Sequence, residues 1–96
     1  MVLVTMEAQV TPEQEKALTR AYAHVMRHRP DAILQSMLTQ DRLEPSIWRI
    51  HTVWKSLEAM EAHYHSNEHM PSAYVFHLAG LIPTATSSDI IAFECE

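Results

Sequence analysis

The sequence predicts an α+β fold in which helices cover one face of an antiparallel sheet. The first observation is a strict alternation of apolar residues over residues 2–10, which is typical of a strand with one buried face. An amphipathic helix follows from residue 12 and ends before Pro30. The later segments follow in the order strand, strand, helix, helical piece and strand. This β-α-β-β-α-β order, with one extra helical segment, indicates a ferredoxin-like sandwich.

Each element has a local signal in the chain. Thr11, Pro12 and Gln14 predict a capped helix start with a capping box. Residues 32–40 and 47–54 are predicted strands, joined by a polar stretch. Ser56 is predicted to cap a helix that runs to about residue 66.

The later elements are predicted in the same way. A further helical piece is expected from about residue 68 towards residue 79, with Pro71 near its first turn. Gly80 stands where a helix needs a left-handed residue. Residues 89–95 are predicted to form the last strand.

Composition sets bounds on function. The 96 residues, of which 47% are hydrophobic and 20% charged, predict one domain over residues 1–96. The net charge of −5 and only seven scattered Lys and Arg argue against a nucleic-acid partner. A single cysteine, Cys95, excludes an internal disulfide and predicts a cytoplasmic protein. No apolar run is long enough to span a bilayer, so no membrane partner is expected.

The end of the third strand carries a recognisable motif. Trp54 is followed by Ser56, a helix rich in Glu and Ala, then Ala62-His63 and a second histidine, His69. This motif resembles the strand–helix junction of the antibiotic-biosynthesis-monooxygenase-like proteins of the dimeric α+β barrel superfamily, and the order of elements agrees over nearly the whole chain. The resemblance implies a homodimer in which two sheets face each other as a barrel.

The residues favour the same assembly independently. One sheet face would expose apolar side chains to water, and a second copy in a two-fold dimer would cover it. That predicted face comprises Leu3, Leu34, Leu38 and Val53, with Ile91 and Phe93 as further candidates.

The sequence predicts a ligand cavity between sheet and helices. We expect Trp48, Trp54, His63 and Tyr74 to line it, with Met6 or Phe76 nearby and His69 as a further substrate-binding residue. The alternative interpretation is that both tryptophans are ordinary core residues with no part in ligand binding. His63 matches the family's Ala-His, and a neutral imidazole there could act as a general base.

The resemblance implies a cofactor-independent monooxygenase that acts on a small aromatic molecule such as a quinol, phenol or polyketide. Because the substrate itself supplies the electrons, we predict no cofactor. Two alternatives stay open: a non-catalytic dimer that binds a small metabolite or is associated with stress, and a heme-binding or heme-degrading relative. Heme degradation is disfavoured because Met6 stands where those relatives have asparagine. Their axial position falls at Ala73 or Tyr74, with His77 about a turn later.

Two polar groups have plainer interpretations. His63, His65 and His69 form an H-x-H-x3-H run, but the side chains of His63 and His65 would point about 160° or more apart on one helix. We therefore predict no dedicated metal site there. Glu7, Arg49 and His51 fall on one face of neighbouring strands, which predicts an ion pair at the dimer face, or less favourably a polar patch that contacts the substrate.

Overall fold

The computed structural model of the chain describes residues 1–67 and 69–94. The elements follow the predicted order of strands and helices. They are β1 (Val2–Gln9), α1 (Pro12–Arg27), β2 (Ile33–Gln40), β3 (Ile47–Trp54), α2 (Leu57–Asn67), α3 (Pro71–Leu78) and β4 (Thr84–Asp89).

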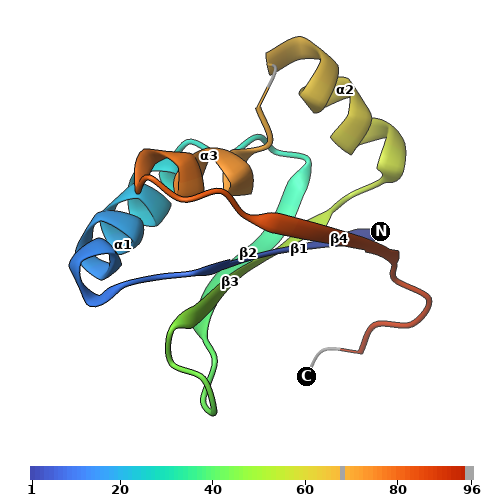
Figure 1. Ribbon diagram of the computed structural model, residues 1–96. Coiled ribbons are helices and arrows are strands. Elements are labelled where there is room, and N and C mark those ends of the chain that lie inside the picture. The colour runs from blue at the N-terminus through green and yellow to red at the C-terminus, as the bar shows by residue number, and fades with distance from the viewer. Residues whose placement is uncertain (68, 95–96) are drawn as a thin grey trace.

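The four strands form one antiparallel sheet in the order β2-β3-β1-β4. β1 is central, and its Met6 lies opposite Ile50 of β3 on one side and Ala85 of β4 on the other. This order is that of a ferredoxin-like sheet, so the predicted fold class is confirmed (Figure 1).

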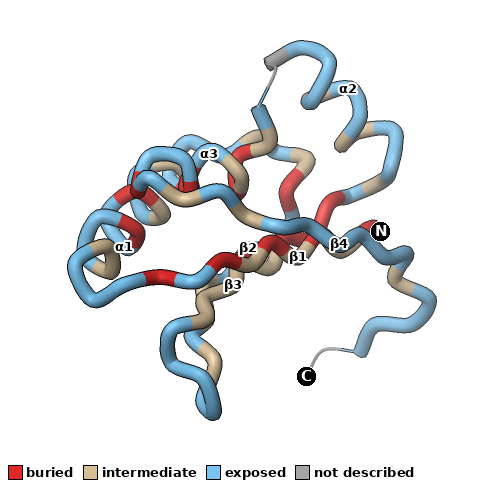
Figure 2. Tube along the Cα trace, in the orientation of Figure 1, coloured by how far each residue is buried: buried red, intermediate tan, exposed pale blue. Residues whose placement is uncertain are grey.

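The helices lie on one side of the sheet. Figure 1 shows α1 and α3 against the sheet, while α2 stands out beyond the end where β3 finishes. The buried residues gather between the sheet and α1 and α3, whereas α2 has no fully buried side chain among those described (Figure 2). The core includes alternate residues of β1 and the fully buried Leu18, Ile50, Trp54, Val75 and Phe76.

A β-bulge in β2 makes one predicted face assignment wrong. The register shifts between Ile33, opposite Trp54, and Gln35, opposite Val53. The extra residue, Leu34, reverses the alternation of the strand beyond it. Leu38 therefore lies opposite Ile50 on the helix-covered side and packs against the core, instead of lining the open face.

The last strand lies earlier than predicted. β4 is Thr84–Asp89, and residues 90–94 form no strand; Cys95, which we included in the predicted strand, lies outside the described residues. All six side chains of β4 are exposed, so backbone pairing with β1 rather than an apolar pattern defines this edge strand. The apolar residues that we assigned to the strand instead follow it, and Ile90 and Phe93 help to line a hollow on the open face.

The predicted caps and helix ends are present. Gln14 Oε1 accepts hydrogen bonds from the backbone N–H and the hydroxyl of Thr11, at 3.0 and 3.1 Å. The Ala59 N–H donates to Ser56 Oγ at 3.0 Å. At the end of α3, Gly80 has φ +79° and the Leu81 N–H reaches the Phe76 carbonyl at 2.9 Å, as in a Schellman motif.

The third helix begins at Pro71 rather than near residue 68, and Glu68 lies outside the described residues. Among the described helices, none has the length and hydrophobicity needed to cross a membrane.

Candidate functional site

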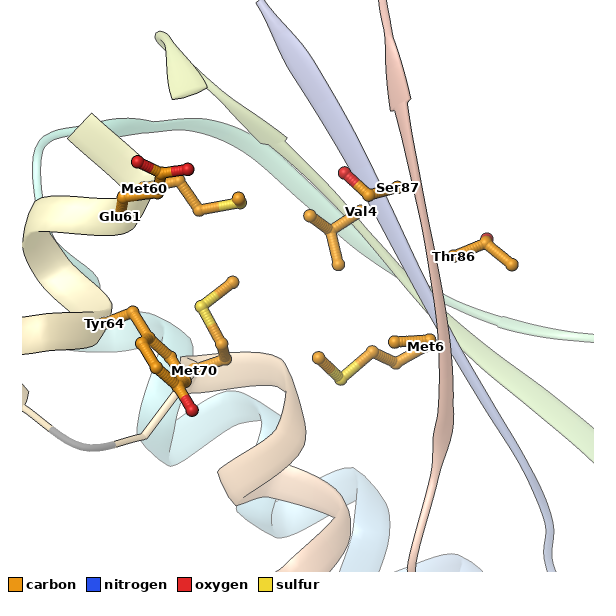
Figure 3. A pocket seen from close by; sticks show the side chains of 9 residues that line it. Val4, Met6, Met60, Glu61, Tyr64, Met70, Thr86 and Ser87 are labelled. Atoms are coloured by element: carbon orange, nitrogen blue, oxygen red, sulfur yellow. The ribbon is translucent and has the colours of Figure 1, made fainter. Parts of the chain in front are cut away.

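The main candidate site is a hollow of about 320 Å³ between α2 and the β1–β4 edge of the sheet. Figure 3 shows Met6, Met60 and Met70 pointing into the same space from β1, α2 and the start of α3. We call it the methionine hollow. Its wall consists of Val4, Met6, Met60, Glu61, Tyr64, Met70, Ala85, Thr86 and Ser87.

The local folding of each element explains this wall. Val4 and Met6 face the helices because alternate residues of β1 point to that side. Met60 and Tyr64 are one turn apart on α2, so both face the sheet. Methionine side chains are flexible and polarizable, and a wall built from three of them can adapt to ligands of different shape.

His63 and Trp54 lie on the same side of the sheet, as predicted. The rings have centroids 5.6 Å apart and are tilted by 45°. Trp54 is fully buried, whereas His63 is half-buried at the edge of the helix layer. Trp54 is therefore a core residue beneath the site, which agrees with the alternative interpretation of the tryptophans. His63 is the member of the pair that a ligand can reach.

A second hollow, of about 160 Å³, lies where the end of α1 meets α2 and the start of α3. His63, His69 and Tyr74 all line it, and the rings of His69 and Tyr74 stack at 5.5 Å and 27°. We call it the histidine hollow. Its full wall is Val25, His28, Arg29, Pro30, His63, His69, Pro71 and Tyr74.

The predicted single cavity is therefore wrong. Trp48 lines a third hollow, against α1, with Glu15, Lys16, Thr19 and Arg20. Trp48 and Trp54 share one face of β3, but they are six residues apart along the strand, a distance of about 20 Å. Met6 lines the methionine hollow, while Phe76 is fully buried in the core and lines none of the hollows described here.

Sequence reasoning missed most of the methionine hollow. Met60, Glu61 and Tyr64 were not among the predicted site residues. Ala85, Thr86 and Ser87 were missed because the last strand was placed too late in the chain. The alternation of β1 was the usable signal for Val4 and Met6, but nothing comparable in residues 84–89 indicates that this segment pairs with β1 and passes them.

Polar groups gather on the open face of the sheet. Arg49 Nε and a terminal guanidinium nitrogen contact Glu7 at 2.7 Å and Asp41 at 2.8 Å. The pKa of Asp41 is lowered, mainly because its carboxylate accepts a hydrogen bond from the Arg49 side chain. The predicted pairing of Glu7 with Arg49 is confirmed, and Asp41 is an additional partner.

His51 lies on the same face, between two threonine hydroxyls. Its Nε2 is 3.0 Å from Thr39 Oγ1 and its Nδ1 is 3.3 Å from Thr5 Oγ1. Burial, and then the charge of Arg49, lower the pKa of His51 below its ordinary value. The fold therefore favours a neutral imidazole at this position.

The three histidines of the H-x-H-x3-H run do not meet at one point, since only His63 and His69 line a common hollow. Within residues 1–67 and 69–94, no three His, Cys, Asp or Glu side chains gather closely enough to hold a metal ion. His65 is exposed on α2, and His77 is exposed in the last turn of α3 and lines none of the hollows described here.

Several known proteins are similar to this chain in structure. A protein from Deinococcus radiodurans that is assigned as an antibiotic biosynthesis monooxygenase has a TM-score of 0.76 and 17% identity, and the match covers 100% of this chain and 99% of that one. Rv0793 from Mycobacterium tuberculosis has a TM-score of 0.73 at 14% identity, covering 98% of each chain. A mutant of SnoaB, a cofactor-independent oxygenase from Streptomyces nogalater, has a TM-score of 0.68 at 17% identity, covering 99% and 97%. At these identities the likeness concerns the fold.

Sequence comparison identifies the family. No curated protein sequence matches the chain. The family model described as antibiotic biosynthesis monooxygenase, however, matches residues 1–70 of the 96. The match includes β1 to α2, and therefore Trp54, His63 and most of the methionine hollow. The chain belongs to the antibiotic biosynthesis monooxygenase family.

Proposed function

We propose that the chain is a cofactor-independent monooxygenase acting on a small aromatic substrate such as a quinol, phenol or polyketide. The observation that carries the proposal is the methionine hollow, found in a member of this family. Its volume of about 320 Å³ and apolar wall suit a small aromatic molecule. SnoaB, a cofactor-independent oxygenase, shares the fold and so supplies an analogy for the chemistry.

In this chemistry the substrate supplies all the electrons. A base removes a proton from the activated carbon or hydroxyl, and the resulting anion passes an electron to O₂. The two radicals combine as a peroxide, which loses water. For a methylene group, CH₂ and O₂ give C=O and H₂O, so one oxygen atom enters the product and the other leaves as water. The protein's task is to hold the substrate away from water and to place the base.

We propose His63 as that base, next to Trp54. Its ring lies at the edge of the helix layer and is partly open to ligands. Because His63 lines the histidine hollow rather than the methionine hollow, the substrate would have to reach past Met60 to meet it. Glu61 lines the methionine hollow directly and is the second candidate for the base.

Oxygen consumption by metal-free protein across a panel of anthrones and quinols tests the proposal. We expect uptake with at least one substrate, and ¹⁸O from ¹⁸O₂ in its product. His63→Ala should lower turnover by a factor on the order of 10²–10⁴, the usual contribution of a positioned base. His65→Ala, an exposed residue of the same helix, is the matched control and should leave turnover unchanged. A loss with Glu61→Gln but not with His63→Ala would transfer the role to Glu61.

A second function, non-catalytic binding of a small metabolite, is favoured by the sparse polar lining of the methionine hollow. Glu61 and Tyr64 are its only titratable wall residues among those described, and no histidine lies in the wall. A cavity of this kind can hold an apolar metabolite without any proton transfer. Saturable binding of a metabolite that is recovered unchanged, with no oxygen uptake on the whole panel, would favour this function over the oxygenase.

We also propose that the chain works as a two-fold homodimer that joins through the open face of the sheet. Support comes from the apolar side chains that remain on this face. Met37 and Phe93 are 44% and 53% exposed there, and Leu3 and Val53 lie beside them. In water this surface would be costly to leave bare, and an isologous contact covers it in both copies at once.

A further inference from the structure

The histidine hollow has a charge pattern of which the proposed oxygenase uses only His63. Its polar wall residues are His28, Arg29, His63, His69 and Tyr74, and none of its described wall residues is acidic. The chain as a whole has 12 Asp and Glu against seven Lys and Arg. A hollow with only basic or neutral polar groups is therefore unexpected from composition, and its residues come from three separate parts of the chain.

Backbone dipoles do not decide the sign of the potential in this hollow. The last turn of α1, which places a partial negative charge nearby, ends just before His28 and Arg29. The first turn of α3, which places a partial positive charge nearby, begins at Pro71. These two contributions roughly offset each other. The side chains, above all the permanently charged Arg29, therefore make the hollow attractive to an anion.

Arg29 is anchored to the end of α1 and still has guanidinium N–H donors for a ligand. One terminal guanidinium nitrogen donates to the Met26 carbonyl at 3.0 Å, which anchors the side chain to the end of α1. A guanidinium has five N–H donors, and within the described residues the Met26 carbonyl is the acceptor that this side chain contacts. The remaining donors can form the paired hydrogen bonds that planar carboxylates accept.

The rest of the wall limits the ligand's size and shape. The volume of about 160 Å³ corresponds to roughly five water molecules. Val25, Pro30 and Pro71 provide apolar surface, and the stacked rings of His69 and Tyr74 form a flat side. We propose that the histidine hollow binds a small organic carboxylate, with Arg29 pairing with the carboxylate and the apolar walls and rings contacting its carbon skeleton. This proposal does not depend on the oxygenase activity.

Titration of ¹⁵N-labelled protein with sodium benzoate tests it by NMR, at an ionic strength held constant with NaCl. We expect saturable shifts of the amide signals that centre on residues 28, 29, 63, 69 and 74. Arg29→Gln should weaken binding about 10- to 100-fold, the effect of removing a hydrogen bond to a charged group. Arg27→Gln removes the same charge two residues away. Arg27 is exposed, as Arg29 is, but it lies outside the wall of the hollow, so this variant should leave the affinity unchanged.

A second pair of variants covers the case in which Arg29→Gln unfolds the end of α1. His69→Gln should weaken benzoate binding several-fold while His65→Gln does not. Equal weakening by Arg27→Gln and Arg29→Gln, or shifts that grow linearly and spread over the surface, would mean bulk charge attraction and overturn the site. Inorganic phosphate is the comparison ligand, and affinity for it equal to or tighter than for benzoate would overturn the assignment to an organic carboxylate.

Discussion

A charge introduced at Met37 should separate the proposed dimer without damaging the fold. Met37 points from β2 to the open face and is 44% exposed in the single chain. An Asp at this position therefore stays in contact with water while the chain is alone. It becomes buried only when a second copy covers the face. Val53, the neighbouring apolar residue, is only 8% exposed, so Val53→Asp would destabilise the chain itself.

The size of the effect follows from symmetry. A two-fold interface places the substitution at two positions, so every cost is doubled. Burying a polar group without a partner costs at least about 2 kcal/mol at each position, and the lost burial of Met37 adds to it. The sum is about 4 kcal/mol or more, which raises the dissociation constant of the dimer roughly 10³-fold.

Sedimentation velocity between nanomolar and high micromolar concentration measures that change. We expect the natural chain to be a dimer throughout the micromolar range and Met37→Asp to be largely a monomer. Circular dichroism should show an unchanged fold. Ile82→Asp, at an 88% exposed position between α3 and β4, is the control and should remain a dimer. A natural chain that is monomeric at micromolar concentration, or a Met37→Asp chain that dimerises as well as the natural one, would refute the reasoning.

Three further predictions concern stability. Leu18→Ala should lower the free energy of unfolding by about 3–5 kcal/mol in urea titrations, because Leu18 is fully buried, whereas Ala17→Gly on the exposed side should cost only about 1 kcal/mol. Ser56→Ala should cost about 1 kcal/mol by loss of the cap on α2, measured in the same way. Because the fold lowers the pKa of His51, the unfolded chain binds more protons there, and stability should fall as the pH drops from about 6.5 towards that lowered pKa. In urea titrations from pH 7.5 to 5, the free energy of unfolding should fall less for His51→Gln than for His65→Gln.

Features that depend on neighbouring residues in the chain were predictable. The capping box of Thr11 and Gln14, the cap at Ser56 and the left-handed Gly80 each need only three or four residues to specify them. The face assignments of β1 and β3 were also correct, because strict alternation holds along both strands.

Features that depend on pairing between distant segments were not predictable. No residue pattern around Leu34 indicates a bulge. The face of Leu38 was therefore assigned by assuming strict alternation along the strand, which gave the wrong face. β4 is held by its hydrogen bonds to β1 while all its side chains are exposed, and the apolar residues after it gave a misleading signal. Trp48 and Trp54 show a different limit, because a shared face says nothing about the distance along a strand.

The position of α2 has a consequence for the chemistry. At about 100° per residue, Tyr64 lies about 40° from Met60 around the helix, while His63 lies about 60° away on the other side. The helix therefore forms one wall of the methionine hollow and presents His63 to the histidine hollow. Met70 lines the first hollow while its neighbours His69 and Pro71 line the second, so the two hollows adjoin. If His63 is the base, the reacting atom must lie at the boundary between them, and a substrate too short to reach from Met6 past Met60 should react slowly.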